Sequence, residues 1–347
     1  MSGLKGSTYM KRYSRQTLFS PIGVDGQERL RRKHVLIVGL GALGSSIAET
    51  LTRAGVGKLT IIDRDYVEES NLQRQLLYSE NDAMERMPKA EAAKRRLNEV
   101  NQDVEIHSIV GDADVPLLER LAPNIDLIMD GTDNFDTRFM MNDISHKFHI
   151  PWIFGSCVGS FGSTFTIIPG KTPCLQCLLK KLPMRGQTCD TVGIIAPAVQ
   201  MVTAYQTAEA LKILSENQWA LRNTYVTFDL WQNQTLSIKA DSIKNADCYT
   251  CGHYPTYPYL QYEATTKTAV LCGRNTVQIR PATSTNCSIA VLADQWKKAG
   301  YKVSANPFLV SVLKDEHRMV LFKDGRALIH GTNDITIAKR VYHSLIG

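Results

Sequence analysis

Residues 34–75 read HVLIVGLGALGSSIAETLTRAGVGKLTIIDRDYVEESNLQRQ, and the succession of patterns in this stretch predicts the fold. Residues 34–38 form a short apolar, β-branched run that is typical of a buried parallel strand. A glycine-rich loop follows, then a helical pattern over residues 45–54, then a second apolar run over residues 59–62 that ends at Asp63. This order of strand, glycine loop, helix, strand and acid is typical of a nucleotide-binding unit.

The glycines of the loop have the spacing G-x-G-x-x-G, with Gly39, Gly41 and Gly44 at the glycine positions. They allow the backbone to turn tightly and to approach a phosphate, whose charge interacts favourably with the N-terminus of the following helix. Asp63 lies 19 residues beyond Gly44, where a carboxylate can accept hydrogen bonds from a ribose. The alternative is that the glycines only permit the helix to pack closely on the strand.

The composition is that of a globular protein with a sizeable core, since 44% of the 347 residues are hydrophobic and 21% are charged. The net charge of +6 is mild and does not favour a nucleic-acid partner. The N-terminal residues contain no apolar run of signal-peptide length, and the chain has no apolar run long enough to span a membrane. We therefore expect a cytoplasmic protein whose eight cysteines are reduced and available for metal binding.

Further apolar runs extend the nucleotide-binding pattern to a large sheet. Residues 104–109 and 125–129 are predicted to form the third and fourth strands, and an antiparallel portion is expected after residue 165. The predicted fold class is α/β, with a Rossmann-like, mostly parallel sheet and flanking helices. We expect this unit to span residues 1–255 and to be followed by a small α+β module over residues 256–347, which supports docking or dimerisation.

The polar residues that follow Asp63 depart from the pattern of a dinucleotide-binding oxidoreductase. They are Asp65, then Asn71, Arg74 and Gln75 in the loop SNLQRQ, and Lys89 at the start of the next predicted helix. Arg74 and Lys89 are candidates to reach back to the phosphates. Because the glycine loop and the helix dipole already serve two phosphates, additional cations fit a triphosphate better. The alternative is that both are solvated surface charges.

A cluster of carboxylates follows the predicted fourth strand, in the sequence DGTDNFDTR at 130–138. In an open parallel sheet, ligands lie beyond the carboxyl ends of the strands. A carboxylate there can hold a magnesium ion, which takes one or two protein carboxylates together with substrate phosphates. We assign the magnesium to Asp133, with Asn134 beside it, rather than to Asp130, which can instead cap the loop.

Two C-x-x-C pairs, Cys174 with Cys177 and Cys248 with Cys251, predict a metal site. Each pair offers two thiolates in one tight turn, and together they complete a tetrahedral four-thiolate set that leaves no open position for a substrate. We therefore predict a structural zinc ion that joins two distant segments. A redox dithiol and a chance pairing are the alternatives.

Two further residues are weak candidates on their own. Cys189 lies outside either pair in a polar loop close to Arg185, where an exposed thiolate can act as a nucleophile or be a bystander. The other three cysteines, Cys157, Cys272 and Cys287, have the surroundings of core or incidental residues. Arg15, in the basic N-terminal stretch, has the pattern of an ordinary solvated charge.

The first 253 residues together resemble the sulfur-carrier-protein adenylyltransferases, the MoeB/ThiF/HesA group related to ubiquitin-activating enzymes. The matching motifs are RYSRQ (12–16), GLGALGS (39–45), DRD (63–65), SNLQRQ (70–75), PKA (88–90), GTDNFDTR (131–138), the paired C-x-x-C sequences and TCDTVG (188–193). Each motif is weak alone, but all of them in this order form a specific signature.

This resemblance implies a homodimer in which each subunit binds ATP and Mg²⁺ and adenylates the C-terminal Gly-Gly carboxylate of a ubiquitin-like sulfur carrier. By analogy Asp63 holds the ribose, and the phosphates are contacted by Asn71, Arg74 and Lys89. Asp133 binds magnesium, and Arg15 reaches the nucleotide of the partner subunit. Attack of a carboxylate on an anionic phosphate requires this kind of fixed positive charge.

The resemblance also implies a role for Cys189 after adenylation, in a covalent linkage to the carrier during sulfur transfer. Since no rhodanese domain is recognisable, the sulfur is expected from a separate cysteine desulfurase or rhodanese. Three other readings remain open: an NAD-dependent oxidoreductase, a zinc-ribbon nucleic-acid-binding protein, and a related enzyme that adenylates a tRNA-linked carboxylate. The first leaves the SNLQRQ loop, Lys89 and the zinc site without a role. The second requires basic and aromatic residues clustered around the cysteine pairs, and only Lys180, Lys181 and Arg185 partly meet this requirement.

Overall fold

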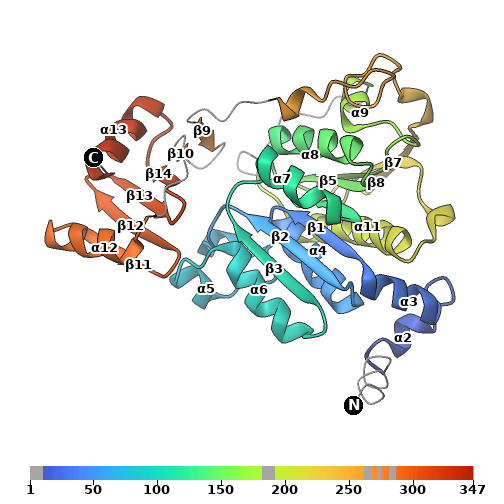
Figure 1. Ribbon diagram of the computed structural model, residues 1–347, viewed down its shortest axis with the longest axis horizontal. Coiled ribbons are helices and arrows are strands. Elements are labelled where there is room, and N and C mark those ends of the chain that lie inside the picture. Colours follow the sequence, from blue (N-terminus) through green and yellow to red (C-terminus); the bar gives the residue numbers. More distant parts are fainter. Residues whose placement is uncertain (1–10, 182–191, 262–266, 272–274, 281–286, 347) are drawn as a thin grey trace. The chain divides into compact units, whose positions relative to one another are not determined.

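The computed structural model describes residues 11–181, 192–261, 267–271, 275–280 and 287–346, with only the backbone described for residues 241 and 267–271. These residues form two compact units (Figure 1), one built mainly from the chain up to Tyr262 and the other from the chain after it. No helix within the described ranges is both long and apolar enough to cross a membrane.

The first unit is organised by an eight-stranded sheet with the strand order β3-β2-β1-β4-β5-β6-β7-β8. The first five strands in this order are parallel to one another, and the last three extend the sheet in an antiparallel manner. The bounds are β1 His34–Val38, β2 Lys58–Asp63, β3 Glu105–Val110, β4 Leu127–Asp130, β5 Trp152–Val158, β6 Phe161–Ile167, β7 Thr224–Asp229 and β8 Gln234–Lys239. The chain runs from β1 to β2 on one side and returns to β4 on the other, so a switch point lies between β1 and β4.

Helices cover both faces of this sheet (Figure 1). One face carries α4 (Ala42–Ala54), α6 (Lys89–Val100) and α11 (Ala196–Leu214), and the other carries α7 (Val115–Leu121), α8 (Phe135–Lys147) and α9 (Leu175–Lys181). Three short helices lie outside these layers, namely α2 (Ser14–Thr17), α3 (Gly23–Arg32) and α5 (Glu80–Met84). Mixed α/β architecture with a large, mainly parallel sheet and flanking helices is therefore confirmed.

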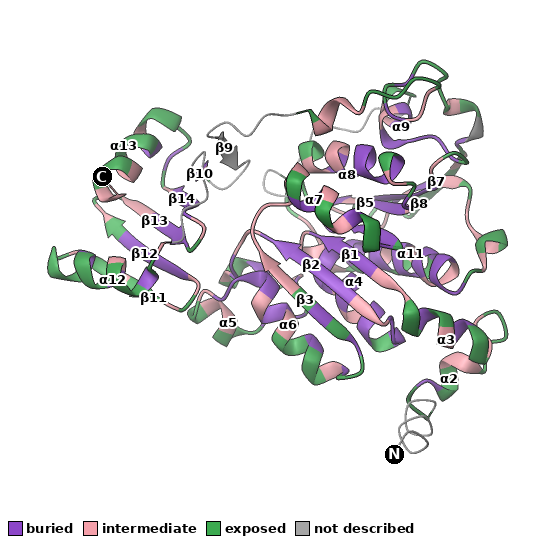
Figure 2. Cartoon of the chain, viewed as in Figure 1, coloured by how far each residue is buried: buried purple, intermediate pink, exposed green. Residues whose placement is uncertain are grey.

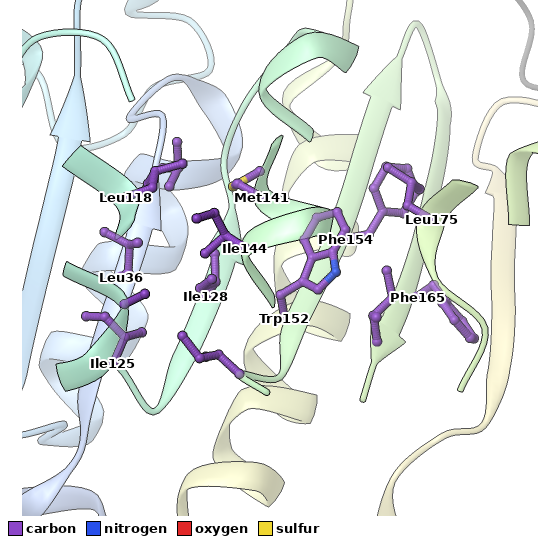
Figure 3. Close-up of a cluster of buried hydrophobic side chains, with 14 of the residues drawn as sticks. Leu36, Leu118, Ile125, Ile128, Met141, Ile144, Trp152, Phe154, Phe165 and Leu175 are labelled. Carbon is purple, nitrogen blue, oxygen red and sulfur yellow. The ribbon is translucent and has the colours of Figure 1, made fainter. Parts of the chain in front are cut away.

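The strands are apolar because both of their faces are buried, as Figure 2 shows for β1 and β2. Between the sheet and helices α7, α8 and α9 the side chains form one continuous core (Figure 3). Trp152, Phe154 and Phe165 from β5 and β6 are fully buried there, against Met141 and Ile144 of α8. Removing this much apolar surface from water holds α8 firmly on the sheet.

The second unit is a six-stranded antiparallel sheet with the order β11-β12-β13-β14-β10-β9 and two helices. The bounds are β9 Lys267–Leu271, β10 Thr276–Arg280, α12 Ile289–Lys298, β11 Lys302–Ala305, β12 Leu309–Lys314, β13 His317–Phe322, β14 Ala327–His330 and α13 Ile335–Ile346. Its core is separate from that of the first unit and includes Trp296, Val310 and Leu321. The expected small α+β module thus contains a small antiparallel sheet with two helices.

Several element boundaries differ from the sequence predictions. Helix α4 begins at Ala42 rather than Ser45. Helix α8 begins at Phe135, because Asn134 caps it by accepting a hydrogen bond from the Thr137 N–H at 2.9 Å. Strands β9, β11 and β14 had no recognisable pattern. β11 is a polar edge strand with the sequence KVSA, so its sequence carries little apolar alternation.

Candidate nucleotide and metal sites

The loop after β1 packs directly against the loop after β4. Gly39 has a left-handed φ of +84°, which favours glycine, and a Cβ on Gly44 would overlap the carbonyl oxygen of Gly39. A Cβ on Gly131, after β4, would overlap the same oxygen. Three glycines thus meet at the switch point of the sheet, and close packing alone accounts for Gly39 and Gly44.

Gly41 differs from these glycines because the space beside it is open. A Cβ built on Gly41 would meet only Nε2 of Gln75, at 3.9 Å. Gln75 is 3% exposed, and within the described residues its Oε1 has no hydrogen-bond partner. A buried polar atom without a partner is costly unless a ligand satisfies it. Gly41 and Gln75 therefore fit a polar ligand that approaches the N-terminus of α4.

Asp63 ends β2 with its carboxylate buried beside the glycine loop. Oδ2 accepts a hydrogen bond from the Leu40 N–H at 2.6 Å, and Oδ1 accepts one from the Asp65 N–H at 2.7 Å. Burial raises the pKa of Asp63, and the nearby Asp65 carboxylate raises it further, while Lys89 and these two hydrogen bonds lower it. Asp63 thus presents a fixed carboxylate next to the glycine loop after β1.

Lys89, at the start of α6, brings an ammonium group into the same region. It is 2% exposed, and its Nζ lies 3.6 Å from Oδ2 of Asp65. The Lys89 backbone N–H donates to the Asp65 carbonyl at 2.9 Å, and Tyr78 donates its hydroxyl to the Leu40 carbonyl at 2.7 Å. A buried ammonium with one long ion pair retains donors for an anionic ligand.

The SNLQRQ loop folds as a short helical turn, Glu69–Asn71, followed by turns that bring Gln75 inward. Asn71 is buried and caps this turn, since its Oδ1 accepts a hydrogen bond from the Glu68 N–H at 3.2 Å. Arg74 is half-buried, and its Nη1 donates to the Ser70 carbonyl at 2.9 Å. Asn71 thus shapes the loop, and the contact of Arg74 with the phosphates stays a prediction.

The two aspartates after β4 have different environments. Asp130 is fully buried, its Oδ2 accepts from Arg138 Nε at 2.9 Å, and its Oδ1 accepts from both the N–H and the hydroxyl of Thr132. Both oxygens are therefore engaged in holding the loop, as expected for a capping residue. Asp133 is exposed at the tip of this loop, immediately before the capping residue Asn134. Of the two carboxylates, Asp133 is the one accessible to a magnesium ion.

Arg64 is a site residue that the sequence analysis missed. It lies between Asp63 and Asp65, and its Nη1 is 3.4 Å from Oδ1 of Asp112. Burial lowers the pKa of Arg64, but nearby carboxylates, including that of Asp133, outweigh burial and raise it overall. Its position between two candidate site aspartates was the available signal. The buried residue Tyr78 had no signal in the sequence, whereas Arg138, which holds Asp130, lies in the GTDNFDTR motif.

The structure does not bring Arg15 to this site within one subunit. Its neighbour Gln16 donates from Nε2 to the Ala54 carbonyl at 2.9 Å, at the C-terminal end of α4. The glycine loop lies at the other end of this 13-residue helix, roughly 20 Å away. Arg15 itself is exposed on α2.

The four predicted metal ligands do come together. The sulfur atoms of Cys174, Cys177, Cys248 and Cys251 all lie within 4.8 Å of one another, with Cys174 and Cys248 at 3.6 Å and Cys177 and Cys251 at 3.5 Å. Tetrahedral zinc with Zn–S bonds of about 2.3 Å requires sulfur–sulfur distances of about 3.8 Å, so this set fits zinc.

Helix α8 anchors both halves of this cysteine cluster. Asn142 accepts at Oδ1 a hydrogen bond from the Leu175 N–H at 2.8 Å, and Asp143 accepts one from the Thr250 hydroxyl at 2.6 Å. Leu175 follows Cys174, and Thr250 lies between Cys248 and Cys251. Adjacent residues of one helix therefore fix two segments that are distant in sequence, which favours a structural metal site.

Of the four cysteines outside the predicted metal-ligand set, the structure describes two. Cys189 and Cys272 lie outside the described residues. Cys157 is buried in β5 and Cys287 is half-buried, in agreement with core or incidental roles.

Comparison with known proteins places the chain in a family. The profile of the ThiF family matches residues 13–250. A sulfur carrier protein ThiS adenylyltransferase of Bacillus subtilis (strain 168) is 52% identical over 338 residues, which cover 97% of this chain and 99% of that protein. A molybdopterin-synthase adenylyltransferase of Escherichia coli (strain K12) is 35% identical over 245 residues, or 70% of this chain and 96% of that protein. The chain therefore belongs to the ThiF family.

A solved structure agrees with this assignment. The crystal structure of E. coli MccB with ATP superposes with a TM-score of 0.60 at 25% sequence identity, over 70% of this chain and 74% of that chain.

Proposed function

We propose that this protein is an adenylyltransferase that uses ATP and Mg²⁺ to activate the C-terminal Gly-Gly carboxylate of a ubiquitin-like sulfur carrier. The observation that carries the proposal is the convergence of Gly41, Gln75, Asp63 and Lys89 at the carboxyl ends of β1 and β2. An open glycine, a buried amide whose oxygen has no partner among the described residues, a fixed carboxylate and a buried ammonium suit a ribose triphosphate. The name of the 52% identical relative supports the same activity.

We assign the predicted residues of the nucleotide site the following roles. The Rossmann-like loop of Gly39, Gly41 and Gly44 and the N-terminus of α4 receive the phosphates. Asp63 binds the ribose, and Asp133 with Asn134 holds magnesium, which neutralises phosphate charge when bound. The remaining polar residues line the phosphate site, and two of them give it positive charge. The two cations are Arg74 and Lys89, and the other residues are Asp65, Asn71 and Gln75.

The reaction needs positioning more than proton transfer. The carboxylate of the carrier attacks the α-phosphate, the bond to the β-phosphate breaks, and pyrophosphate leaves with its electron pair. The attacking group is already ionised, so the protein supplies no general base. The contribution of Lys89 and Arg74 is fixed positive charge, and losing one such group costs roughly 100-fold or more in rate.

The carrier of the thiamine pathway is the better candidate substrate. Identity is 52% to the ThiS adenylyltransferase along 97% of this chain but 35% to the molybdopterin-synthase adenylyltransferase along 70%. The first of these relatives also covers the second unit, which we propose is a distinct module over residues 256–347 that supports docking or dimerisation. Sulfur then comes from a separate cysteine desulfurase or rhodanese, with Cys189 acting after adenylation.

A homodimer explains why Arg15 is remote from its own nucleotide site. We assign Arg15 to the active site of the partner subunit, where it adds one more cation to the triphosphate. A hollow of about 420 Å³ between α4 and α6 offers a surface for a second copy. It is lined by Leu76, which is 51% exposed, and by the Arg53–Glu49 and Arg96–Glu99 ion pairs.

Mixing two inactive variants tests the activity and the dimer together. Arg15→Ala and Asp133→Ala each impair every site of their own homodimer, because each site needs both residues. A mixed dimer contains one intact site, so random exchange of subunits restores about a quarter of the wild-type rate of carrier-dependent pyrophosphate release. No restoration in dimers verified to exchange would place Arg15 in its own subunit. Near-normal activity of Asp133→Ala would remove the magnesium assignment.

A further inference from the structure

Arg64 is a cation at the nucleotide site that the proposed chemistry does not use. It occupies the carboxyl end of β2 directly after Asp63, and its side chain is 29% exposed. Its ion pair with Asp112 has a distance of 3.4 Å from Nη1 to Oδ1. A planar cation that is held at one edge and open to solvent elsewhere is free to receive a ligand on its face.

The charges around Arg64 keep it in place. Carboxylates on three different loops interact with it, from Asp63 and Asp65 after β2, Asp112 after β3 and Asp133 after β4. Together they raise its pKa against the opposing effect of burial. Asp112 holds Nη1 of the guanidinium at the end of β3, while part of the side chain stays exposed.

The strand order gives the direction in which a bound nucleotide extends. Phosphates lie at the glycine loop after β1, and the ribose lies at Asp63 after β2. The next strand in the sheet is β3, so the base continues toward the loop after β3, away from the phosphates. The Gly111 N–H donates to the Asp63 carbonyl at 3.0 Å, which holds that loop against the end of β2. Arg64 and Asp112 bridge these two strand ends.

The loop after β3 is also suitable for a flat ligand. Val110 and Gly111 are half-buried, and Ala113 packs against the core under the sheet, so the residues on either side of Asp112 are small or apolar. Guanidinium groups stack on aromatic rings through their planar face, which an ammonium group lacks.

We propose that Arg64 is the platform for the adenine base, with its planar face against the ring and Asp112 holding its edge. This inference rests on the proposed function, since it names the residue that recognises the base of the same nucleotide. It makes Arg64 a specificity-determining residue that acts on the base and leaves the triphosphate contacts unchanged.

The test compares ATP with a ligand that lacks the base, and wild-type protein with a variant that lacks the Arg64 side chain. Binding of ATP and of ribose 5-triphosphate, which has no base, is measured by titration calorimetry with Mg²⁺ and without carrier. We expect Arg64→Ala to weaken ATP binding about 3- to 30-fold and to leave ribose 5-triphosphate unchanged. Arg64→Lys, which keeps the charge without the planar face, should recover only part of the loss. Arg32→Ala, an exposed arginine on α3, is the matched control.

Three outcomes overturn the platform. Equal weakening of both ligands places Arg64 on the phosphates, and full recovery by Arg64→Lys shows that charge alone matters. If Asp112→Asn weakens binding of both ATP and ribose 5-triphosphate, the ion pair only maintains the loop. Wild-type protein that binds neither ligand contradicts the proposed function itself, whereas wild-type binding with an unaffected Arg64→Ala variant contradicts the platform alone.

Discussion

Replacing Lys89 by Met, with the controls below, distinguishes the contribution of this ammonium group to stability from its contribution to the adenylation rate. Methionine keeps the buried stem but removes a charge that lies 3.6 Å from Asp65 and also lowers the pKa of Asp63. At an effective dielectric constant of about 20, two unit charges 3.6 Å apart attract by about 4–5 kcal/mol. Because breaking a buried pair also leaves its partner uncompensated, we expect a loss of about 3–5 kcal/mol in the free energy of unfolding.

The pH dependence of that loss follows from Asp63. Burial already raises its pKa above the unfolded value, and without Lys89 the pKa rises further. A carboxyl group with a raised folded-state pKa stabilises the fold below its unfolded pKa and loses this contribution as the pH rises through the folded value. The Lys89→Met variant should therefore be most destabilised near about pH 8 and closer to wild type near about pH 5.

Urea unfolding at these two pH values measures the effect, and Lys89→Met/Asp65→Asn is the matched control. Neutralising Asp65 removes the uncompensated charge, so the double variant should recover about half or more of the lost stability. Its adenylation rate should stay roughly 100-fold or more below wild type, since the cation at the phosphates is still absent. Equal destabilisation at both pH values, with no recovery in the double variant, would refute this view of the site.

Two further predictions concern the glycine loop and the cysteine cluster. Gly44→Ala should destabilise the fold, because its Cβ would overlap the Gly39 carbonyl, whereas Gly41→Ala should leave thermal stability near wild type and weaken ATP binding. Calorimetric unfolding and ATP titration distinguish these outcomes, and similar melting temperatures for both variants would contradict the assignment. Cys248→Ser should lose bound zinc and lower the melting temperature by several degrees, measured by metal analysis and calorimetry. Cys287→Ser is its control, and zinc retained at wild-type stoichiometry would contradict a four-thiolate site.

The parts of the fold that the sequence predicted are those with strong local patterns. Strands β1 and β2 follow from short apolar runs that are buried on both faces. The two cysteine pairs come together as predicted, because each pair supplies half of the ligands of a tetrahedral site. In these cases the chemistry of a short segment determines the outcome.

Other features depend on tertiary contacts that no local pattern encodes. Tyr78 follows the polar SNLQRQ loop and would be expected at the surface, yet it is buried against the glycine loop, as is Gln75. In the second unit Arg326 is fully buried, with its guanidinium 3.9 Å from the centroid of the Phe322 ring. Burial of such polar groups depends on what the rest of the chain packs around them.

The identity of several site residues was predictable, but their positions relative to one another were not. The family resemblance placed Asp63, Lys89 and Asp133 in one site, and the structure brings Asp63 and Lys89 together at the ends of the strands. Arg64 was not predicted, because an arginine between two aspartates is also typical of an ordinary surface ion pair. Arg15 shows the reverse case, since a role implied by resemblance has no support within one subunit.

Carrier-dependent exchange of pyrophosphate into ATP tests the central claim most directly. Zinc-loaded protein with Mg²⁺ is assayed with a thiamine-pathway carrier and with a molybdopterin-synthase carrier, each also prepared without its terminal glycine. We predict exchange that depends on the thiamine-pathway carrier and disappears when the glycine is removed. Exchange with only the molybdopterin-synthase carrier would contradict the choice of carrier but not the chemistry. No exchange with either carrier, from folded protein that binds ATP, would contradict adenylation of a Gly-Gly sulfur carrier.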